Sequence, residues 1–438
     1  MEWLQATLGP KGYDFPLEWY VNEEIQAYSY HPATNYYPTV DYNPDGPNPG
    51  AYKTVAGLEE VYTENGGQIL YETTAKYLLQ NEAGDVTGVV AVSGERGPIQ
   101  LNASRGVVVC TGGYAANQDM LDFFVPVASR ACVMNSGARE DGSGIKMAMW
   151  AGAILEQGNG VQIWNRGLMY DDTVFGPPYG TGRVCIYGSQ PFLRVNARGE
   201  RFMNESQEYP LSFSAALNQP GRFAWMVWDS GYWDDMVQFD MGGCSRMTPT
   251  VSGGSYNADV YNTNVMDKAN VDDYWFAPDI EKGGIKVCDT LEELADAMGF
   301  DASDKETFLA TVAHYNELVA NGEDVDYGKP AIHLSAIDEP PYYAVRTGCG
   351  FLVTQSGAYV NDRMQVLSRD VDRHVIPGLY AIGNVASGFN AFEFSMDTTL
   401  GSLARCATNG WIAANEIAGV EIDDLPEHTP YRNRNVFE

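Results

Sequence analysis

The sequence predicts an α/β fold in which a mostly parallel sheet is interrupted by an inserted α+β domain. The run Gly106–Cys110 is continuously apolar and ends in Thr111-Gly112-Gly113, as expected for a strand buried in a parallel sheet. From about residue 155 to 340 the sequence becomes rich in glycine, asparagine and aromatic residues. A strand and turn then return at Gly378–Gly383, which indicates that the first domain resumes after the insertion.

Two domains are expected because 438 residues exceed what one ordinary hydrophobic core encloses. We assign 1–154 and 341–438 to one discontinuous domain, and 155–340 to an inserted domain that caps the substrate side. The chain is 45% hydrophobic and 12% aromatic, and this composition argues against disorder.

Composition and charge exclude several classes of function. With 58 acidic and 27 basic residues the net charge is −31, which repels nucleic acids and anionic membranes. The seven cysteines are dispersed without a CxxC pair, and the five histidines form no HExxH motif, so no metal site is expected. No apolar run reaches the length of a transmembrane helix, and residues 1–15 lack the pattern of a secretory signal. These features do not determine the cellular compartment in which the protein acts.

Local patterns predict several further elements. We expect a strand, a loop and a strand over 66–92, and a helix over 143–153. Two capping boxes, at Thr290 and Ser303, predict two helices that close the inserted domain. A final helix is expected over 401–417, whereas the Tyr-, Pro- and Asn-rich stretch 1–55 is interpreted as a loop region.

Glycine-bearing turns are the first candidates for a binding site. Thr111-Gly112-Gly113 ends a buried strand, the place where ligands bind in a doubly wound sheet. Gly142-Ser143-Gly144 and Gly401-Ser402-Leu403 each begin a predicted helix, whose first amides attract anionic groups. The structural alternative for each of these segments is an ordinary turn or helix start.

Several segments in one order resemble a single family, the FAD-dependent flavoproteins of fumarate reductase and succinate dehydrogenase, with urocanate reductases and 3-ketosteroid dehydrogenases. The segments are Glu72–Ala75 with Gly84–Gly88, Val107–Gly113 with Asn117, Gly142–Ala148 with Ala151–Ala153, Val195–Glu205, the stretches TLEELADAMG, HYNELVANGEDVDYGKP and IDEPPYYAV, and Val375–Asn384. Each motif alone is weak, but together they span nearly the whole chain.

The resemblance implies FAD as the cofactor and a Rossmann-like domain that binds it. Residues implied to contact FAD are Ala75 near the adenine, Thr111, Gly112 and Gly113, Asp141, Gly142 and Ser143 near the flavin region, Gly383 and Asn384 at the ribityl chain, and the amides of Gly401, Ser402 and Leu403 at the flavin ring. Two of these positions depart from the family. Where this chain has Ser143 the family has Asp, and where it has Asn384 the family has Glu.

The family's first βαβ unit, with its GxGxxG turn for the pyrophosphate, has no counterpart in this sequence. We therefore expect an incomplete Rossmann-like domain, as in a truncated product, a fragment, or one of two chains that assemble. Tight FAD binding by this chain alone is not expected.

The resemblance also implies where catalysis occurs. Tyr209 stands where fumarate-reducing members have the proton-donating Arg, and Arg346 could bind one carboxylate. Their structural alternatives are a buried aromatic at a domain edge and an ion-paired arginine. The stretches 350–357 and 387–397 lack the family's carboxylate-binding His and Arg, so fumarate is not the expected substrate. Phe351, Phe389 and Glu393 are expected to line a pocket, although Phe351 and Phe389 could equally be core residues.

Three functions remain after these observations. The first is an FAD-dependent oxidoreductase that reduces or forms an activated C=C bond by hydride transfer with flavin N5. Its small unsaturated substrate would be aromatic or bulky, and the resemblance implies an electron-donating flavoprotein or cytochrome as partner. The second is a dehydrogenase of the 3-ketosteroid type. The third is a truncated, non-catalytic remnant that does not bind FAD on its own.

Overall fold

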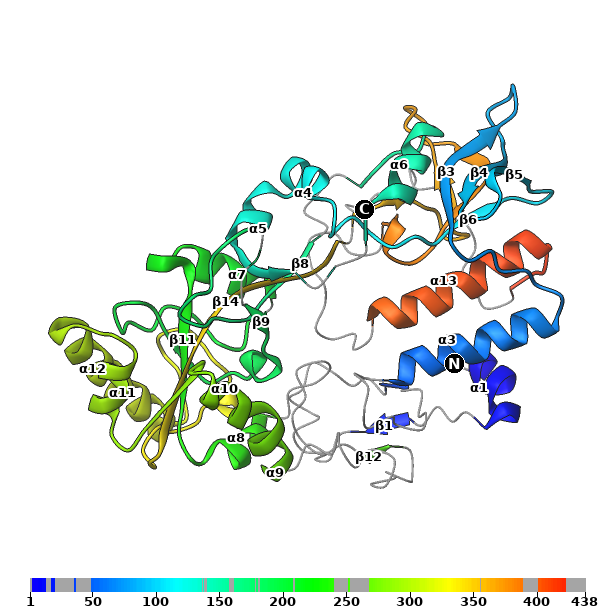
Figure 1. Ribbon diagram of the computed structural model, residues 1–438. Helices are drawn as coiled ribbons and strands as arrows, with labels where there is room; N and C mark the ends of the chain where they lie inside the picture. Colours follow the sequence, from blue (N-terminus) through cyan, green and yellow to red (C-terminus); the bar gives the residue numbers. More distant parts are fainter. Residues whose placement is uncertain are drawn as a thin grey trace, which may run out of the picture.

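The computed structural model describes residues 2–12, 17–19, 35–36, 49–135, 137, 140–156, 161–177, 179, 182–207, 209–239, 251–252, 268–354, 356–388 and 401–422. Figure 1 shows two lobes, and most of the segment coloured green to yellow lies in one of them. The blue-to-cyan and orange-to-red segments form the other lobe. Strand β14 (Tyr342–Thr354) runs from one lobe to the other.

The larger sheet is built around β14. Its path is β10-β11-β14-β8-β9, and β13 and β7 also pair with β14. The strands are β7 (Cys132–Asn135), β8 (Val161–Leu168), β9 (Arg183–Val184), β10 (Leu193–Val195), β11 (Ala224–Trp228) and β13 (Ile285–Cys288). Only the β14–β7 pair is parallel among them, so this sheet is mixed.

The two faces of this sheet carry separate cores, because successive side chains of a strand point to opposite faces. One core contains Leu168, Met226 and Val345 and packs against aromatic residues such as Trp228 and Phe276. The other contains Val195, Trp225 and Ala344 and packs against two helices. Full burial of one such side chain, Phe308 for example, contributes about 1.5–3 kcal/mol.

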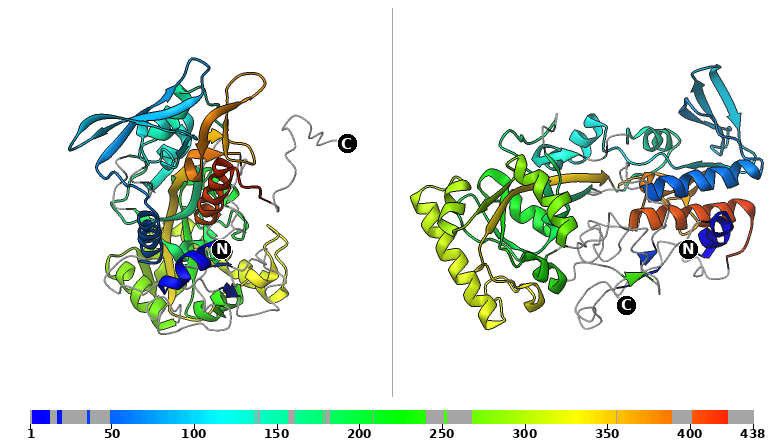
Figure 2. Two further views of the ribbon diagram at one scale, coloured as in Figure 1. Left: turned by 90° about the vertical axis from the view of Figure 1, so that its right-hand side faces the viewer. Right: turned by 60° about the horizontal axis from the view of Figure 1, so that its bottom comes forward.

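Helices cover the faces of the sheet and form the outer edge of this lobe. They are α7 (Tyr209–Leu217), α8 (Tyr232–Phe239), α9 (Lys268–Asn270), the π-helix η5 (Val271–Phe276), α10 (Ala277–Glu281), α11 (Leu291–Ala297) and α12 (Ala302–Asn321). Short 3-10 turns are η2 (Ile186–Ser189), η3 (Pro220–Arg222) and η6 (Ala331–His333). In Figures 1 and 2, α11 and α12 lie at the end of the lobe farthest from β3–β5.

One of the two predicted capping boxes is confirmed and the other is wrong. The Thr290 hydroxyl accepts a hydrogen bond from the Glu293 amide at 3.2 Å and caps α11. Helix α12 is capped instead by Asp301, whose carboxylate accepts from the amides of Ser303 and Asp304 at 2.9 Å. Ser303 therefore lies inside the helix, because the aspartate two residues earlier is an equally good cap.

The other lobe contains the parallel pair that the sequence predicts. β6 (Val107–Val109) pairs in parallel with β17 (Val375–Ala381), and β16 (Gln365–Leu367) follows on the other side of β17. β6 is the terminal strand of this sheet within the described residues, and Val107 and Val108 are only half-buried. The expectation of a strand buried on both faces was therefore wrong for these two residues.

A three-stranded antiparallel meander extends this lobe. β3 (Thr73–Gln80), β4 (Val86–Ser93) and β5 (Gly97–Asn102) confirm the predicted strand–loop–strand pattern, and Figure 2 shows them projecting from the lobe. The helices of this lobe include α4 (Gln118–Phe124), α5 (Pro126–Ala131), α6 (Ser143–Trp150) and α13 (Gly401–Ala418). The predicted helices over 143–153 and 401–417 thus correspond to α6 and α13.

The remaining elements of this chain are short or N-terminal. η7 (Gly383–Val385) follows β17, and β15 (Ala358–Tyr359) pairs with β18 (Ala386–Ser387). β12 (Val251–Ser252) pairs with β1 (Leu17–Trp19), which also pairs with β2 (Asn35–Tyr36).

The stretch 1–55, interpreted as loop, also contains α1 (Glu2–Leu8), η1 (Gly9–Lys11) and the start of α3 (Pro49–Glu64). That interpretation was wrong for these elements; η1 and α3 form because Pro10 and Pro49 are well placed in the first turn of a helix.

The described residues contain neither a membrane-spanning helix nor a cluster of metal-binding side chains. None of the helices described is long and apolar enough to cross a bilayer. No group of three or more histidine, cysteine, aspartate or glutamate side chains there is arranged as a metal site.

Candidate functional site

The turns that follow two neighbouring parallel strands meet at one edge of the sheet. Val109 of β6 lies opposite Ala381 of β17, and the Ile382 amide donates to the Val109 carbonyl at 3.0 Å. Because both strands run the same way, Thr111–Gly113 and Gly383–Asn384 emerge from the same end. Gly112 and Gly383 have φ angles of 76° and 69°, a region that L side chains rarely adopt.

Glu140 connects these two turns. Its Oε1 accepts a hydrogen bond from Asn384 Nδ2 at 3.1 Å. A Cβ atom added at Gly112 would lie 3.2 Å from Oε1, and one added at Gly113 would lie 3.2 Å from Oε2. Oε2 is buried and has no hydrogen-bond partner among the described residues. The edge of the sheet therefore presents a carboxylate oxygen that can accept a hydrogen bond from a bound hydroxyl or amide.

Asp141–Ser143 lies against the first turn. The Gly142 amide donates to the Gly113 carbonyl at 2.9 Å, and Asp141 Oδ1 accepts from the Ser143 amide at 2.9 Å. The hydrogen bonds from Ser143 lower the pKa of Asp141 below its ordinary value. A Cβ atom at Gly144 would lie 1.9 Å from Thr111 Oγ1, so glycine is required for α6 to approach this closely.

Helix α13 approaches the same place through its second turn. The Arg405 guanidinium donates to Asn384 Oδ1 at 2.6 Å, and Cys406 Sγ would lie 2.9 Å from a Cβ atom at Gly383. Gly401, Ser402 and Leu403 form the first three positions of this helix. The predicted flavin-contacting segments Thr111–Gly113, Asp141–Ser143 and Gly383–Asn384 are thus brought together, and α13 reaches them through Arg405 and Cys406.

Ala75 is not part of this cluster of contacts. It lies in β3, opposite Ala91 of β4, in the separate meander sheet. Its assignment to the adenine stays a prediction.

Tyr209 is the first residue of α7 and is 8% exposed. Its hydroxyl oxygen accepts a hydrogen bond from Arg166 Nη2 at 2.5 Å, and Arg166 is 1% exposed on β8. One turn later on α7, Phe213 packs against the core that contains Ala115 and Val385. α7 thus holds Tyr209 where the two lobes meet.

The other predicted substrate residues differ in their surroundings. Phe351 is fully buried and belongs to the same core as Ala115 and Val385, which matches its structural alternative. Phe389 and Glu393 lie outside the described residues.

Arg346 lies on the opposite face of the sheet from Arg194. Thr347 shares a face with Arg194, whose Nη1 donates to Thr347 Oγ1 at 3.0 Å, so its neighbour Arg346 points the other way. There Arg346 Nη2 donates to the Tyr170 carbonyl at 2.5 Å, and its guanidinium carbon lies 5.6 Å from the Phe223 ring centre. These contacts suit a cation that holds the sheet to a loop. The binding of a substrate carboxylate by Arg346 stays a prediction.

Sequence reasoning missed Glu140, Arg166 and Arg194. Arg194 is 3% exposed, and its partners are neutral: Thr347 Oγ1 and the Gly188 carbonyl. Burial lowers the pKa of Arg194 to about 10. The sequence did carry a signal for Arg194, since it is a single cation inside the apolar stretch Phe192-Leu193-Arg194-Val195. A charge that is buried in such a strand needs a polar partner.

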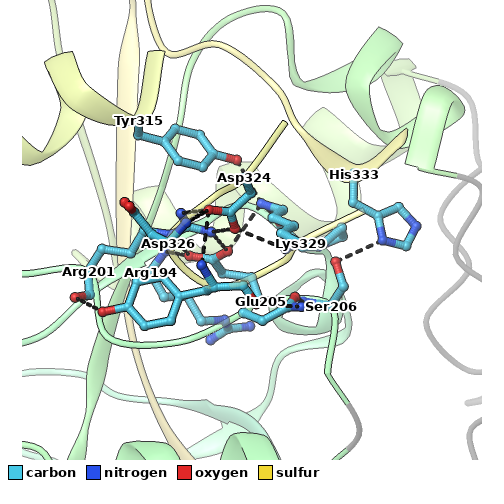
Figure 3. Close-up of polar contacts among 12 residues, drawn as sticks. Arg194, Arg201, Glu205, Ser206, Tyr315, Asp324, Asp326, Lys329 and His333 are labelled. Atoms are coloured by element: carbon cyan, nitrogen blue, oxygen red, sulfur yellow. Dashed lines mark hydrogen bonds and ion pairs between the residues drawn. The ribbon is translucent and has the colours of Figure 1, made fainter. Parts of the chain in front are cut away.

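Arg201, within the segment Val195–Glu205, belongs to a buried ion network that Figure 3 shows. Arg201 donates to both oxygens of Glu205 at 3.0 and 2.9 Å, and to both oxygens of Asp324 at 3.0 and 2.7 Å. Lys329 lies 3.3 Å from Glu205 and donates to the Tyr315 hydroxyl at 2.7 Å. Paired charges of this kind hold the motif against α12 and its following loop.

The charges in this network shift each other's ionisation. Burial raises the pKa of Asp324, but hydrogen bonds from Arg201 and the Lys329 amide outweigh it and lower the pKa to about 2. His333, beside the network in Figure 3, has a pKa lowered to about 4 by burial and by the charge of Lys329. Its ring nitrogens contact Ser206 Oγ at 2.8 Å and the Phe239 carbonyl at 3.2 Å.

Comparison with known proteins yields one family and several relatives. A family model described as an FAD binding domain matches residues 30–394. The chain is 28% identical over 328 residues to the vinyl phenol reductase of Lactiplantibacillus plantarum, covering 74% of this chain and 62% of that protein. It is 26% identical over 357 residues to a probable fumarate reductase of Shewanella frigidimarina, covering 80% of this chain and 51% of that protein. The chain thus spans between half and two thirds of the length of these relatives.

Solved structures show the same fold. The open conformation of a flavocytochrome c3 fumarate reductase superimposes with a TM-score of 0.60 at 22% identity, covering 95% of this chain and 61% of that one. A 3-ketosteroid dehydrogenase from Rhodococcus jostii gives a TM-score of 0.59 at 22% identity, covering 87% of this chain and 68% of that one. At this identity the likeness establishes the fold alone.

Proposed function

This chain belongs to the FAD binding domain family, and we propose that it acts as an FAD-dependent oxidoreductase on an activated C=C or CH–CH bond. The observation that carries the proposal is the junction of the Thr111–Gly113 and Gly383–Asn384 turns through Glu140. A sheet edge of this kind, where two parallel strands end, is where α/β proteins bind cofactors.

The residues at this edge fit FAD. Gly112 turns the backbone at this edge with a φ of 76°, and Glu140 Oε2 is a buried acceptor without a described partner. We propose that Glu140 and Asn384 form hydrogen bonds with hydroxyl groups of FAD, and that the amides of Gly112 and Gly113 donate to its phosphate oxygens. When bound, FAD would supply the hydride acceptor or donor.

We propose further that 155–340 forms a capping domain and that the Rossmann-like domain of this chain is incomplete. The larger sheet supports the capping assignment, because β8, β9, β10, β11 and β13 come from 155–340, while β7 and the central strand β14 come from the flanking segments. A cap of this kind excludes water from the reacting atoms.

We propose an unsaturated substrate with an aromatic or bulky apolar part. One relative is named a vinyl phenol reductase and another a 3-oxosteroid 1-dehydrogenase, and both names describe substrates of this shape. Tyr209 would donate or accept the proton at the second carbon, at the meeting point of the two lobes. An electron-donating flavoprotein or cytochrome would complete the reductive direction, since one relative is named a fumarate reductase that uses cytochrome.

The test begins with FAD titration of the purified chain, followed by flavin fluorescence and absorbance. Binding at micromolar FAD is the expected result. A chain that takes up no FAD would contradict the proposal and support the non-catalytic remnant. Glu292→Gln, which removes an exposed carboxylate in the other lobe, is the control for nonspecific charge effects.

Reaction class is tested on the FAD-loaded chain. Viologen-reduced enzyme is mixed with cinnamate-like acids or vinyl phenols, and oxidised enzyme is mixed with steroids and an artificial dye. Flavin reoxidation by the first set supports the reductase. Dye reduction by the second set identifies the 3-ketosteroid type. Tyr209→Phe is expected to lower the rate about 10²–10⁴-fold, the usual contribution of a general acid or base.

A further inference from the structure

The hydroxyl of Tyr209 contacts the guanidinium of Arg166. Arg166 Nη2 lies 2.5 Å from the hydroxyl oxygen, and the guanidinium carbon lies 5.5 Å from the centre of the same ring. Both residues are buried, with Arg166 at 1% exposure and Tyr209 at 8%. The Cys185 amide donates to the Arg166 carbonyl at 2.7 Å and helps to fix the strand that carries this arginine.

The direction of this hydrogen bond follows from the chemistry of the two groups. A guanidinium has only donors, so the phenol oxygen must be the acceptor. The O–H bond of Tyr209 is therefore directed away from Arg166. A positive charge next to the oxygen also stabilises the phenolate relative to the phenol.

We propose that Arg166 is a positioning residue that orients the Tyr209 hydroxyl for proton transfer and stabilises the phenolate that the transfer leaves. This inference rests on the proposed role of Tyr209. After hydride has been added to one carbon of the double bond, the neighbouring carbon holds an electron pair. The Tyr209 O–H bond breaks, its proton forms a C–H bond at that carbon, and the phenolate later regains a proton from water.

Other charged groups near this pair are few and buried. Arg194 on β10 is close enough to Arg166 that the charge of Arg166 lowers the pKa of Arg194, after the larger effect of burial. Cys349 on β14 and Cys185 are buried thiols, and burial raises the pKa of Cys349 to about 12, so it stays neutral. Glu205 accepts from the Arg194 amide at 3.3 Å but is ion-paired to Arg201 and Lys329. Arg166 is the described cation in direct contact with the Tyr209 oxygen.

The experiment measures the ionisation of Tyr209 itself, without FAD or substrate. The chain is labelled with tyrosine carrying ¹³C at Cζ, and Tyr209→Phe identifies the resonance. A pH titration then gives the midpoint of Tyr209 ionisation in each variant. Arg166→Gln is expected to raise that midpoint by about one to three pH units, the usual effect of removing an adjacent opposite charge.

Two further variants keep the result interpretable. Arg346→Gln removes a guanidinium from the opposite face of the same sheet and is expected to leave the midpoint unchanged. Arg166→Lys keeps the charge and replaces Arg166→Gln if the glutamine variant does not fold; its expected shift is upward but smaller, because lysine lacks the planar fork of donors. A midpoint that stays within about 0.3 pH unit in every folded Arg166 variant overturns the proposal.

Turnover separates this inference from the proposed function. In FAD-loaded enzyme that turns over, Arg166→Gln is expected to lower kcat at least about tenfold with KM within about twofold, and Arg166→Lys to recover part of the loss. A shifted midpoint in a chain without FAD-dependent turnover would refute the function while supporting the pairing. An unshifted midpoint in an active enzyme would refute the pairing alone.

Discussion

Asn384 Nδ2 donates a 3.1 Å hydrogen bond to Oε1 of Glu140, and this contact ties the turn after β17 to the segment that precedes α6. The two residues are 244 positions apart in the sequence. Because the second carboxylate oxygen of Glu140 is buried without a described partner, this junction presents an acceptor at the proposed FAD site. Hydrogen bonds to charged groups contribute roughly 1.5–3 kcal/mol when they form.

Glu140→Gln is therefore expected to weaken FAD binding about tenfold or more, because an amide accepts less strongly than a carboxylate. Fluorescence titration with FAD measures the dissociation constant. Glu292→Gln is the matched control and is expected to bind FAD like the parent chain. Equal affinities in the two variants would exclude Glu140 from the site.

Gly113→Ala is expected to destabilise the chain by about 1–3 kcal/mol through overpacking. The added Cβ would lie 1.9 Å from Thr354 Oγ1, which accepts from the Tyr114 amide at 2.9 Å. Urea denaturation followed by circular dichroism measures the free energy of unfolding. Gly410→Ala on α13 is the control, since its Cβ meets only Ile382 Cδ1 at 3.6 Å and alanine favours helix by up to about 1 kcal/mol. A Gly113→Ala chain as stable as the control would contradict the close packing of this turn.

Asp324→Asn is expected to destabilise the chain by about 3–5 kcal/mol near neutral pH, because it breaks a buried ion pair with Arg201. The folded pKa of Asp324, about 2, lies below its ordinary value of 3.8. Its stabilising effect is therefore present above pH 3.8 and is lost as pH falls toward 2. Unfolding free energies between pH 5 and 2 should fall less steeply in Asp324→Asn than in the parent. A parallel pH dependence would show that Asp324 does not titrate with folding.

The ionisation of His333 affects the stability of the chain over a separate pH range. Its folded pKa of about 4 lies below the ordinary 6.5, because burial and Lys329 disfavour the charged ring. The unfolded chain thus binds a proton at higher pH than the folded chain does, and stability is lost as pH falls from 6.5 toward 4. His333→Gln should flatten the stability profile in that window. A profile that stays as steep in His333→Gln as in the parent chain would show that His333 does not titrate with folding.

Local signals allowed much of the fold to be predicted. The apolar run before Thr111 and the Thr290 cap correspond to β6 and α11 because strand periodicity and capping depend on neighbouring residues. The Ser303 cap failed for the same local reason, since Asp301 competes two residues away. The half-burial of β6 could not be predicted, because burial depends on which strands lie beside it.

The candidate site was predicted only in part. Thr111–Gly113, Gly142 and Gly383 could be identified because turns with positive φ select glycine. Glu140 and Arg166 were missed, since one charged residue in a loop or strand carries no local signal of its partner. Arg346 and Tyr209 were both candidates in the sequence, but only the fold shows that Tyr209 contacts Arg166 and that Arg346 points to the face of the sheet opposite Arg194.

The sequence by itself determined the family, the order of strands and helices, and the glycine turns, because these depend on residue types at short spacing. The tertiary structure alone decided that Glu140 meets Asn384 and that Arg166 meets Tyr209. Both contacts join segments that only the pairing of strands and the packing of helices bring together. Their chemistry therefore depends on the pairing of β6 with β17 and on the packing of α7 against β8.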